Sequence, residues 1–174
     1  MNITKPIIRT VQALSIAALL SYAVQLVFHL VSFSAYFTHK NPALIYNPSL
    51  NLNALFGVTP LSFNLTMACV LLISILHLWI WFSLVLVVFN INLNLPFSQQ
   101  ISGTLQKVSI LFVFIWIIYC CLLMLIDRIE TAEKVHFGPV YSFHPYLLVA
   151  GFVFILSIIF KQGYQSQQDN QLTI

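Results

Sequence analysis

The sequence predicts an all-α membrane protein whose four transmembrane helices form an antiparallel up-down bundle. Three observations lead to this class: four long apolar stretches almost free of charge, 60% hydrophobic against 6% charged residues, and a mean hydropathy of +0.93. Soluble domains carry about 25% charged residues. Because the bilayer interior has no water to bond backbone N–H and C=O groups, the spanning segments are expected to be helices. A transmembrane β-barrel would show short alternating segments instead of these continuous apolar runs.

The apolar stretches set the expected span boundaries. A bilayer core about 30 Å thick requires roughly 20 apolar residues per helix. We expect spans over 11–37, 63–89, 108–126 and 145–161, with outer loops over 38–62 and 127–144, a cytoplasmic loop over 90–107 and a cytoplasmic tail over 162–174. The fourth span is short, and we expect Lys161 to reach the interface at one of its ends.

Basic residues predict the orientation of the chain. Four spans place both termini and the middle loop on one side of the membrane. That side carries Lys5, Arg9, Lys107 and Lys161, whereas the outer loops carry Lys40, Arg128 and Lys134. Since Lys and Arg accumulate on the cytoplasmic side, we expect both termini in the cytoplasm. The chain has no polybasic block, and it therefore does not indicate direct nucleic-acid binding.

The middle loop leads into the third span through an amphipathic segment. Ser98 is a good N-cap, because its hydroxyl can accept hydrogen bonds from the first turn. Ile101, Leu105 and Val108 follow at helical spacing on one face, and polar residues including Ser102 occupy the rest. This segment is either an interfacial anchor or a docking surface for a cytosolic partner.

Glycine and proline mark the expected helix ends. The third helix is expected to continue past the membrane and to end at Gly138-Pro139, and Pro145 is expected in the first turn of the fourth helix. Gly163 is expected to stop that helix in a left-handed C′ conformation, which leaves 164–174 loosely ordered. A short strand at 50–53 is a weaker expectation, based on alternating Leu and Asn.

Polar side chains inside the first two spans form a candidate site. The first span carries them at heptad spacing, and the second continues the pattern: Ser15, Tyr22, Gln25, His29, Ser32 and Tyr36, then Ser74, His77 and Trp81. We call Tyr22, Gln25, His29, His77 and Trp81 the polar seam, and we expect a histidine–glutamine hydrogen bond within it. The seam is either interhelical packing or a ligand pocket or proton-sensitive switch.

The sequence indicates no catalytic residue, metal site or cofactor. Two histidines without a carboxylate at similar depth are a poor ligand set for a metal. Proton-coupled transport would require a charged residue in the middle of a span, and the sequence has none there. The outer group of Asp127, Glu130, Glu133, His136 and His144 is interspersed with basic residues and has the pattern of a solvated helix cap. Cys69, Cys120 and Cys121 lie in or beside spans, where thiols behave as small hydrophobes.

Two motifs resemble a known family. The first motif is Pro96-Phe97-Ser98 in the middle loop, with Leu105 downstream. The second is C-terminal and combines the run from Ile159 through Lys161 and Gly163 to Tyr164 with the tail from Gln168 to Leu172-Thr173-Ile174. Both resemble the bacterial four-span proteins grouped as domain-of-unknown-function family 2975, and this resemblance implies a bacterial inner membrane. Gln99 and Gln100 stand where that family usually has an acidic residue. The family has no assigned activity, but its genes often lie beside small helix-turn-helix regulators, which implies membrane-linked regulation.

The expected function is therefore non-enzymatic. We expect an accessory or regulatory protein whose partner is a cytosolic transcriptional regulator or a second copy of the chain. Its expected contact residues are those of the two motifs: Pro96, Phe97, Ser98, Lys161, Gly163, Leu172 and Ile174. The alternative is binding or transport of a small ligand along the polar seam.

Overall fold

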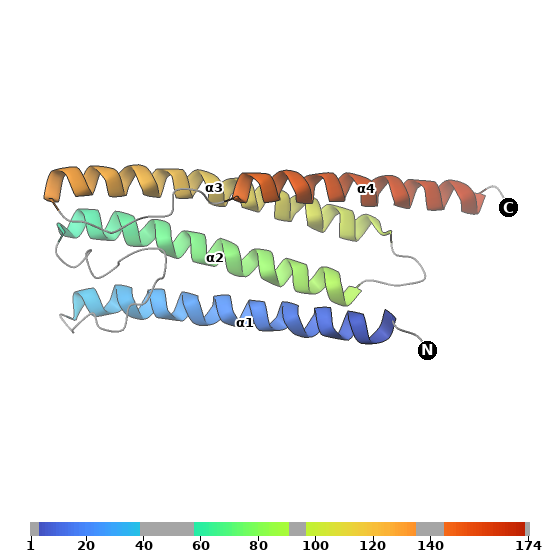
Figure 1. The fold of residues 1–174 in the computed structure, drawn as a ribbon, viewed down its shortest axis with the longest axis horizontal. Coiled ribbons are helices and arrows are strands. Elements are labelled where there is room, and N and C mark those ends of the chain that lie inside the picture. The colour runs from blue at the N-terminus through green and yellow to red at the C-terminus, as the bar shows by residue number, and fades with distance from the viewer. Residues whose placement is uncertain (1–3, 39–57, 91–96, 135–144, 173–174) are drawn as a thin grey trace. The chain divides into compact units, whose positions relative to one another are not determined.

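The computed structural model describes residues 4–38, 58–90, 97–134 and 145–172. Within these ranges the chain forms four helices, which follow one another as drawn in Figure 1. They are α1 (Thr4–Phe37), α2 (Pro60–Asn90), α3 (Gln99–Glu133) and α4 (Tyr146–Leu172). The strand expected at 50–53 lies outside the described residues.

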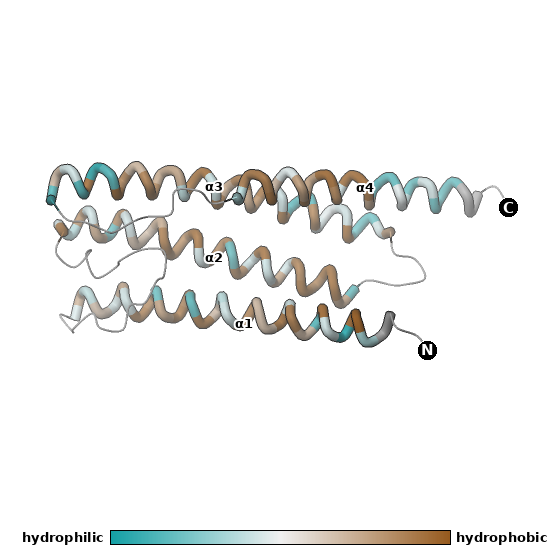
Figure 2. The backbone as a smooth tube through the Cα atoms, in the orientation of Figure 1, coloured by the Kyte–Doolittle hydropathy of each residue, from teal (hydrophilic) through white to brown (hydrophobic). Residues whose placement is uncertain are grey.

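Each of the four helices in the described ranges is long and apolar enough to cross a membrane. This confirms the helical class and is compatible with a multi-pass membrane protein. The 35 residues of α3 extend about 52 Å at 1.5 Å per residue, well beyond a bilayer core of about 30 Å. Figure 2 shows hydrophilic residues gathered at the C-terminal ends of α3 and α4, where the helices continue past their apolar parts.

The starts of α3 and α4 follow the chemistry expected from the sequence. The Ile101 N–H donates to Ser98 Oγ at 3.2 Å, and the Ser102 N–H donates to the Ser98 carbonyl at 3.2 Å, which confirms Ser98 as the N-cap. Pro145 lies directly before α4, and its carbonyl accepts the Val149 N–H at 2.9 Å. A proline is tolerated there because the first helical N–H groups have no partner within the helix.

The predicted end of α3 at Gly138-Pro139 is wrong. The helix ends at Glu133, and Lys134 takes a left-handed φ of 54°. The Lys134 N–H still reaches the Glu130 carbonyl at 3.1 Å. A left-handed residue after the last turn is the usual way to end a helix, and glycine is its usual occupant. Here Lys134 takes the left-handed conformation, and the helix ends before Gly138, the residue that the sequence pattern favours for this role.

The predicted end of α4 at Gly163 is also wrong. The helix continues through Gly163 to Leu172, so the part of the tail expected to be loosely ordered is helical up to that residue. Gly163 does not take a left-handed φ. Its role is a packing contact, described with the candidate site below.

The chain divides into two compact units. The first unit contains Met1–Leu20, Leu78–Phe114 and Pro145–Ile174, and the second contains Ser21–His77 and Ile115–His144. The boundary falls within α1, α2 and α3, so each of these helices contributes a segment to both units.

The second unit has an apolar core built from α1, α2 and α3. Phe63 and Met67 are each only 1% exposed, and the Tyr36 ring stacks on Phe63 with 3.6 Å between centroids and 11° between planes. The buried members of the core are Val58, Phe63, Met67, Val70, Tyr119, Leu122, Ile126 and Ile129. Apolar side chains of all three helix segments therefore converge on the start of α2.

In the first unit, serine hydroxyls join α3 to α4. Ser102 Oγ donates to the Ser157 carbonyl at 2.8 Å, and Ser109 Oγ donates to the Ala150 carbonyl at 2.9 Å. The later serine on α3 bonds the earlier carbonyl on α4, so the two helix segments run in opposite directions. Ile101, Leu105 and Val108, which were predicted to share one face of this helix, are buried. Ser102 was expected on the polar face but is buried too, because its hydroxyl has this carbonyl partner.

The core predicts a large effect of truncation at position 63. Phe63→Ala removes a fully buried ring and its stacking on Tyr36, and we expect a loss of about 3–5 kcal/mol in the free energy of unfolding. Phe82→Ala is the control, because Phe82 is 52% exposed. Denaturant titration of both variants in the same detergent measures the difference, and equal losses would contradict the assigned core.

Candidate functional site

The polar stripe of α1 faces inward, as its spacing predicted. Ser15, His29 and Ser32 are buried, and Tyr22 and Gln25 are half-buried. Most other residues of α1, including its large apolar side chains, are exposed. A helix in lipid is expected to turn its polar residues toward protein in this way, since unpaired polar groups are costly in hydrocarbon.

His29 makes a hydrogen bond that joins α1 to α2. Its Nδ1 lies 2.8 Å from Ser74 Oγ, and Ser74 Oγ lies 2.9 Å from the carbonyl oxygen of Val70. A serine hydroxyl has one proton, and a carbonyl can only accept. Both contacts are hydrogen bonds at once when Ser74 donates to Val70 and the Nδ1–H of His29 donates to Ser74.

His77 is covered by Tyr22. The two rings stack with 5.2 Å between centroids and 13° between planes. The Nδ1 of His77 lies 3.0 Å from the Ile73 carbonyl of its own helix. Because that carbonyl only accepts, this hydrogen bond requires the proton on Nδ1. In neutral His77, Nε2 then carries the lone pair.

These contacts connect four residues of the second unit in two pairs. Tyr22 meets His77, and His29 meets Ser74. The expected histidine–glutamine bond between the two helices pairs His77 with Gln25, but the Nδ1 of His77 contacts a carbonyl of its own helix. The interhelical histidine contact described above joins His29 to Ser74 instead. Gln25 lies half-buried on α1, and Trp81 is half-buried on the α2 segment of the first unit. Ser74 belongs to the predicted polar pattern but was left out of the polar seam, although its spacing of three from His77 places it on the same face of α2.

The second candidate site joins the two motif segments in the first unit. A Cβ added to Gly163 would lie 2.6 Å from Cδ1 of Phe97, so the ring packs directly on bare helix backbone. Phe97 also meets Phe160 edge-on, with 5.4 Å between centroids and 67° between planes. We call Phe97, Phe160 and Gly163 the aromatic clamp. The clamp explains Gly163 within a helix: glycine alone leaves room for the ring.

The other expected contact residues lie around the clamp or beyond the described chain. Ser98 is the N-cap of α3, and Lys161 is exposed on α4. Leu172 is the last residue of α4. Pro96 and Ile174 lie outside the described residues.

A third cluster, made of polar side chains at the start of α2, was missed by sequence reasoning. The carboxylate of Glu133 accepts the Thr59 N–H at 2.8 Å and the Thr59 hydroxyl at 3.0 Å. It also accepts the Ser62 hydroxyl at 2.8 Å. An anion at a helix N-terminus satisfies free N–H groups and complements the helix dipole. Glu133 lies far from Thr59 and Ser62 in sequence, so no local pattern predicts their contact. The sequence shows only that Thr59-Pro60 can begin a helix.

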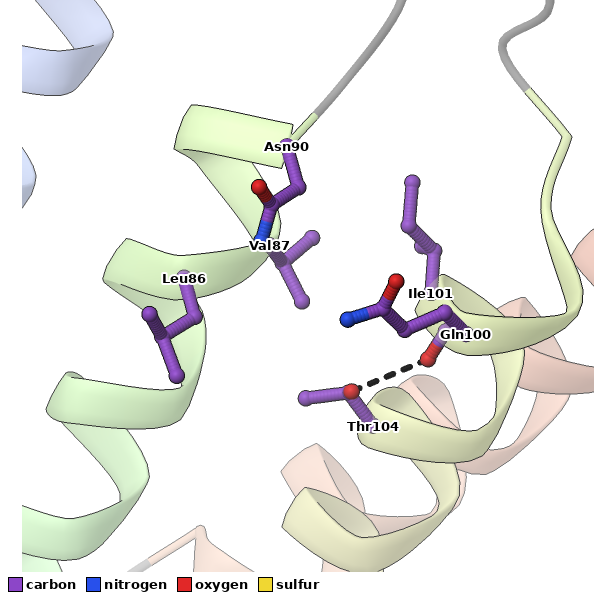
Figure 3. A pocket seen from close by; sticks show the side chains of 6 residues that line it. All are labelled: Leu86, Val87, Asn90, Gln100, Ile101 and Thr104. Carbon is purple, nitrogen blue, oxygen red and sulfur yellow. Dashed lines mark hydrogen bonds between the residues drawn. The ribbon is translucent and has the colours of Figure 1, made fainter.

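Two cavities lie between helices, and the larger one shares Ser62 and Glu133 with the third cluster. One of about 50 Å³ lies between the end of α2 and the start of α3 (Figure 3), lined by Leu86, Val87, Asn90, Gln100, Ile101 and Thr104. It has room for only a few water molecules. The other, of about 200 Å³, lies between the start of α2 and the end of α3, lined by Ser62, Leu65, Leu125, Arg128, Ile129, Ala132 and Glu133. Neither cavity is lined by a residue of the polar seam.

Metal-binding geometry is not found within the described ranges. No group of three or more His, Cys, Asp or Glu side chains is placed there to hold a metal ion. His136 and His144 of the outer acidic group lie outside those ranges.

Comparisons with models of known families, with curated proteins and with solved structures give no match to this chain. The resemblance to family 2975 therefore remains a hypothesis based on motifs. The structure adds that Phe97 of one motif packs on Gly163 of the other.

The His29–Ser74 bond predicts a specific cost for losing one hydroxyl. Ser74→Ala leaves the buried Nδ1 of His29 without its acceptor, and we expect a loss of about 0.6–2 kcal/mol in stability. Ser83→Ala is the matched control, because the Ser83 hydroxyl bonds only within its own helix, to the Trp79 carbonyl at 2.9 Å. Unfolding in detergent compares the two variants, and a similar small loss in both would argue against the interhelical bond.

The aromatic clamp predicts opposite results for two glycines of α4. Gly163→Ala forces a methyl group against the Phe97 ring, and we expect reduced stability. Gly151→Ala is the control, since a Cβ there meets nothing within 4 Å. Alanine replacing glycine in a helix otherwise adds about 0.5–1 kcal/mol, so Gly151→Ala should be neutral or stabilising. Thermal unfolding of both variants tests this, and equal stabilisation would rule out the clamp.

Proposed function

We propose that this chain is a non-enzymatic accessory or regulatory protein of a bacterial inner membrane, with both termini in the cytoplasm. Its partner is a cytosolic protein, for which a small helix-turn-helix regulator is the leading candidate on the resemblance to family 2975. The partner contacts the 96–107 segment and the C-terminal tail together. The aromatic clamp carries the proposal, because it holds the starting turns of α3 against the polar end of α4.

The surface beside the clamp is polar, which suits contact with water and with a partner in the cytosol. We call it the amide-rich surface, and it consists of the exposed polar residues of both segments: Gln99, Gln100, Gln106 and Lys107 on α3, with Lys161, Gln162, Gln165, Ser166, Gln168 and Asp169 on α4. The 27 residues of α4 extend about 40 Å. This is longer than a bilayer core of about 30 Å, so the polar end lies in or beyond the interface.

The charges of this surface support the proposed orientation. Lys107 and Lys161 outnumber Asp169, the one acidic residue of the amide-rich surface. Lys5 and Arg9 lie on the same side in a four-span topology. Excess Lys and Arg near span ends favours the cytoplasmic side.

The contacts of the polar seam favour packing over ligand binding. The buried His29 is bonded to Ser74, and His77 is covered by the Tyr22 ring. Polar residues that bond across helices in this way stabilise helix association. We therefore place the function at the amide-rich surface.

Deletion of the tail tests the proposed partner contact. Removing 165–174 takes away four residues of the amide-rich surface (Gln165, Ser166, Gln168 and Asp169) but leaves the clamp, and we expect loss of the regulator from cross-linked complexes in native membranes. A variant in which 165–174 is replaced by glycine and serine of equal length controls for chain length and should fail equally. Membrane levels of all three proteins are measured in parallel. Undiminished recovery of the regulator with either variant would remove the tail from the proposal.

A further inference from the structure

The larger cavity lies in the second unit, at a different part of α3 from the amide-rich surface. It is a groove of about 200 Å³ between the first turns of α2 and the last turns of α3. Leu65, Leu125 and Ile129 form its apolar part, and Arg128 and Glu133 supply one positive and one negative charge. We call it the Arg128 groove.

We propose that the Arg128 groove binds a phospholipid whose headgroup carries a primary ammonium. Its phosphate lies at Arg128, its ammonium lies at Glu133, and the glycerol end of its acyl chains lies along Leu65 and Leu125. The groove lies where α3 passes from its apolar stretch into charged residues, which is the depth at which a lipid changes from chain to headgroup.

Arg128 is available to an anion. Among the residues that the structure describes, none forms a hydrogen bond or ion pair with its guanidinium, and its side chain is exposed. A guanidinium binds a phosphate through two parallel N–H···O bonds. The neighbouring acidic residues disfavour a purely anionic headgroup: Asp127 precedes Arg128 in sequence, and Glu133 lines the same groove.

Glu133 retains capacity for a cation. Its two oxygens accept three hydrogen bonds from Thr59 and Ser62. An ionised carboxylate offers about four acceptor positions, so one remains for an ammonium N–H. The three protein bonds also hold the carboxylate in place before a ligand arrives.

The size of the groove favours part of a lipid over a complete small molecule. Pockets for drug-sized ligands are typically about 300–1,000 Å³, and this groove has about 200 Å³. A headgroup and the first part of the chains need only local space, because the rest of the lipid remains in the bilayer. The exposed Leu65 leaves the groove open at its apolar side.

Native mass spectrometry of the full chain tests the proposal. The protein is released from detergent after equilibration with equal amounts of phosphatidylethanolamine, phosphatidylcholine and phosphatidylglycerol. We expect about tenfold greater retention of phosphatidylethanolamine, equivalent to about 1.4 kcal/mol. Phosphatidylcholine has no N–H donor for Glu133, and phosphatidylglycerol has no ammonium. Equal retention of the three lipids would overturn the proposal.

Three variants locate the site. Arg128→Gln removes the charge at the phosphate position, Ala132→Leu fills the groove without changing charge, and both should abolish the preference. Arg9→Gln is the matched control, because it removes an exposed arginine of α1 that does not line the groove. Circular dichroism confirms that each variant is folded. A preference that survives both groove variants would also overturn the proposal.

Discussion

Every polar group inside a bilayer needs a partner supplied by the protein, and this constraint governs how the helices of this chain meet. Most buried hydroxyls satisfy it locally: Ser32 donates to the Phe28 carbonyl at 2.7 Å, and Thr66 donates to the Ser62 carbonyl at 2.8 Å. Ser102 and Ser109 instead reach carbonyls of α4. Within the described part of the chain, no buried side-chain nitrogen or oxygen lacks a partner. The few interhelical polar contacts therefore select which helix faces can pack together.

The same constraint separates what the sequence predicts well from what it predicts poorly. Helix number and the inward face of α1 follow from composition and spacing, because lipid selects apolar residues outside and polar residues inside. The Ser98 cap is also local, since donor and acceptor lie within one turn. These features need no knowledge of a neighbouring helix.

Helix ends and partners depend on contacts between segments distant in sequence. Glycine has two possible roles near a helix end: a left-handed stop or a close approach. Local sequence favours the first for Gly163, whereas Phe97, which lies far away in the chain, makes it the second. His29 was placed on the correct face of α1, but the rotation and register of α2 decide that it meets Ser74 and that His77 lies against Tyr22. The Glu133 cluster was missed for the same reason.

The fit of Phe97 on Gly163 has a consequence for chains related to this one. The space shared by the two positions is fixed by the separation of the α3 start and α4, so a gain in volume at one must be matched by a loss at the other. Substitution at these positions should therefore be correlated during divergence: chains with alanine or serine at the position of Gly163 should carry a smaller side chain at that of Phe97. Such covariation would identify relatives whose motifs have otherwise drifted beyond direct recognition.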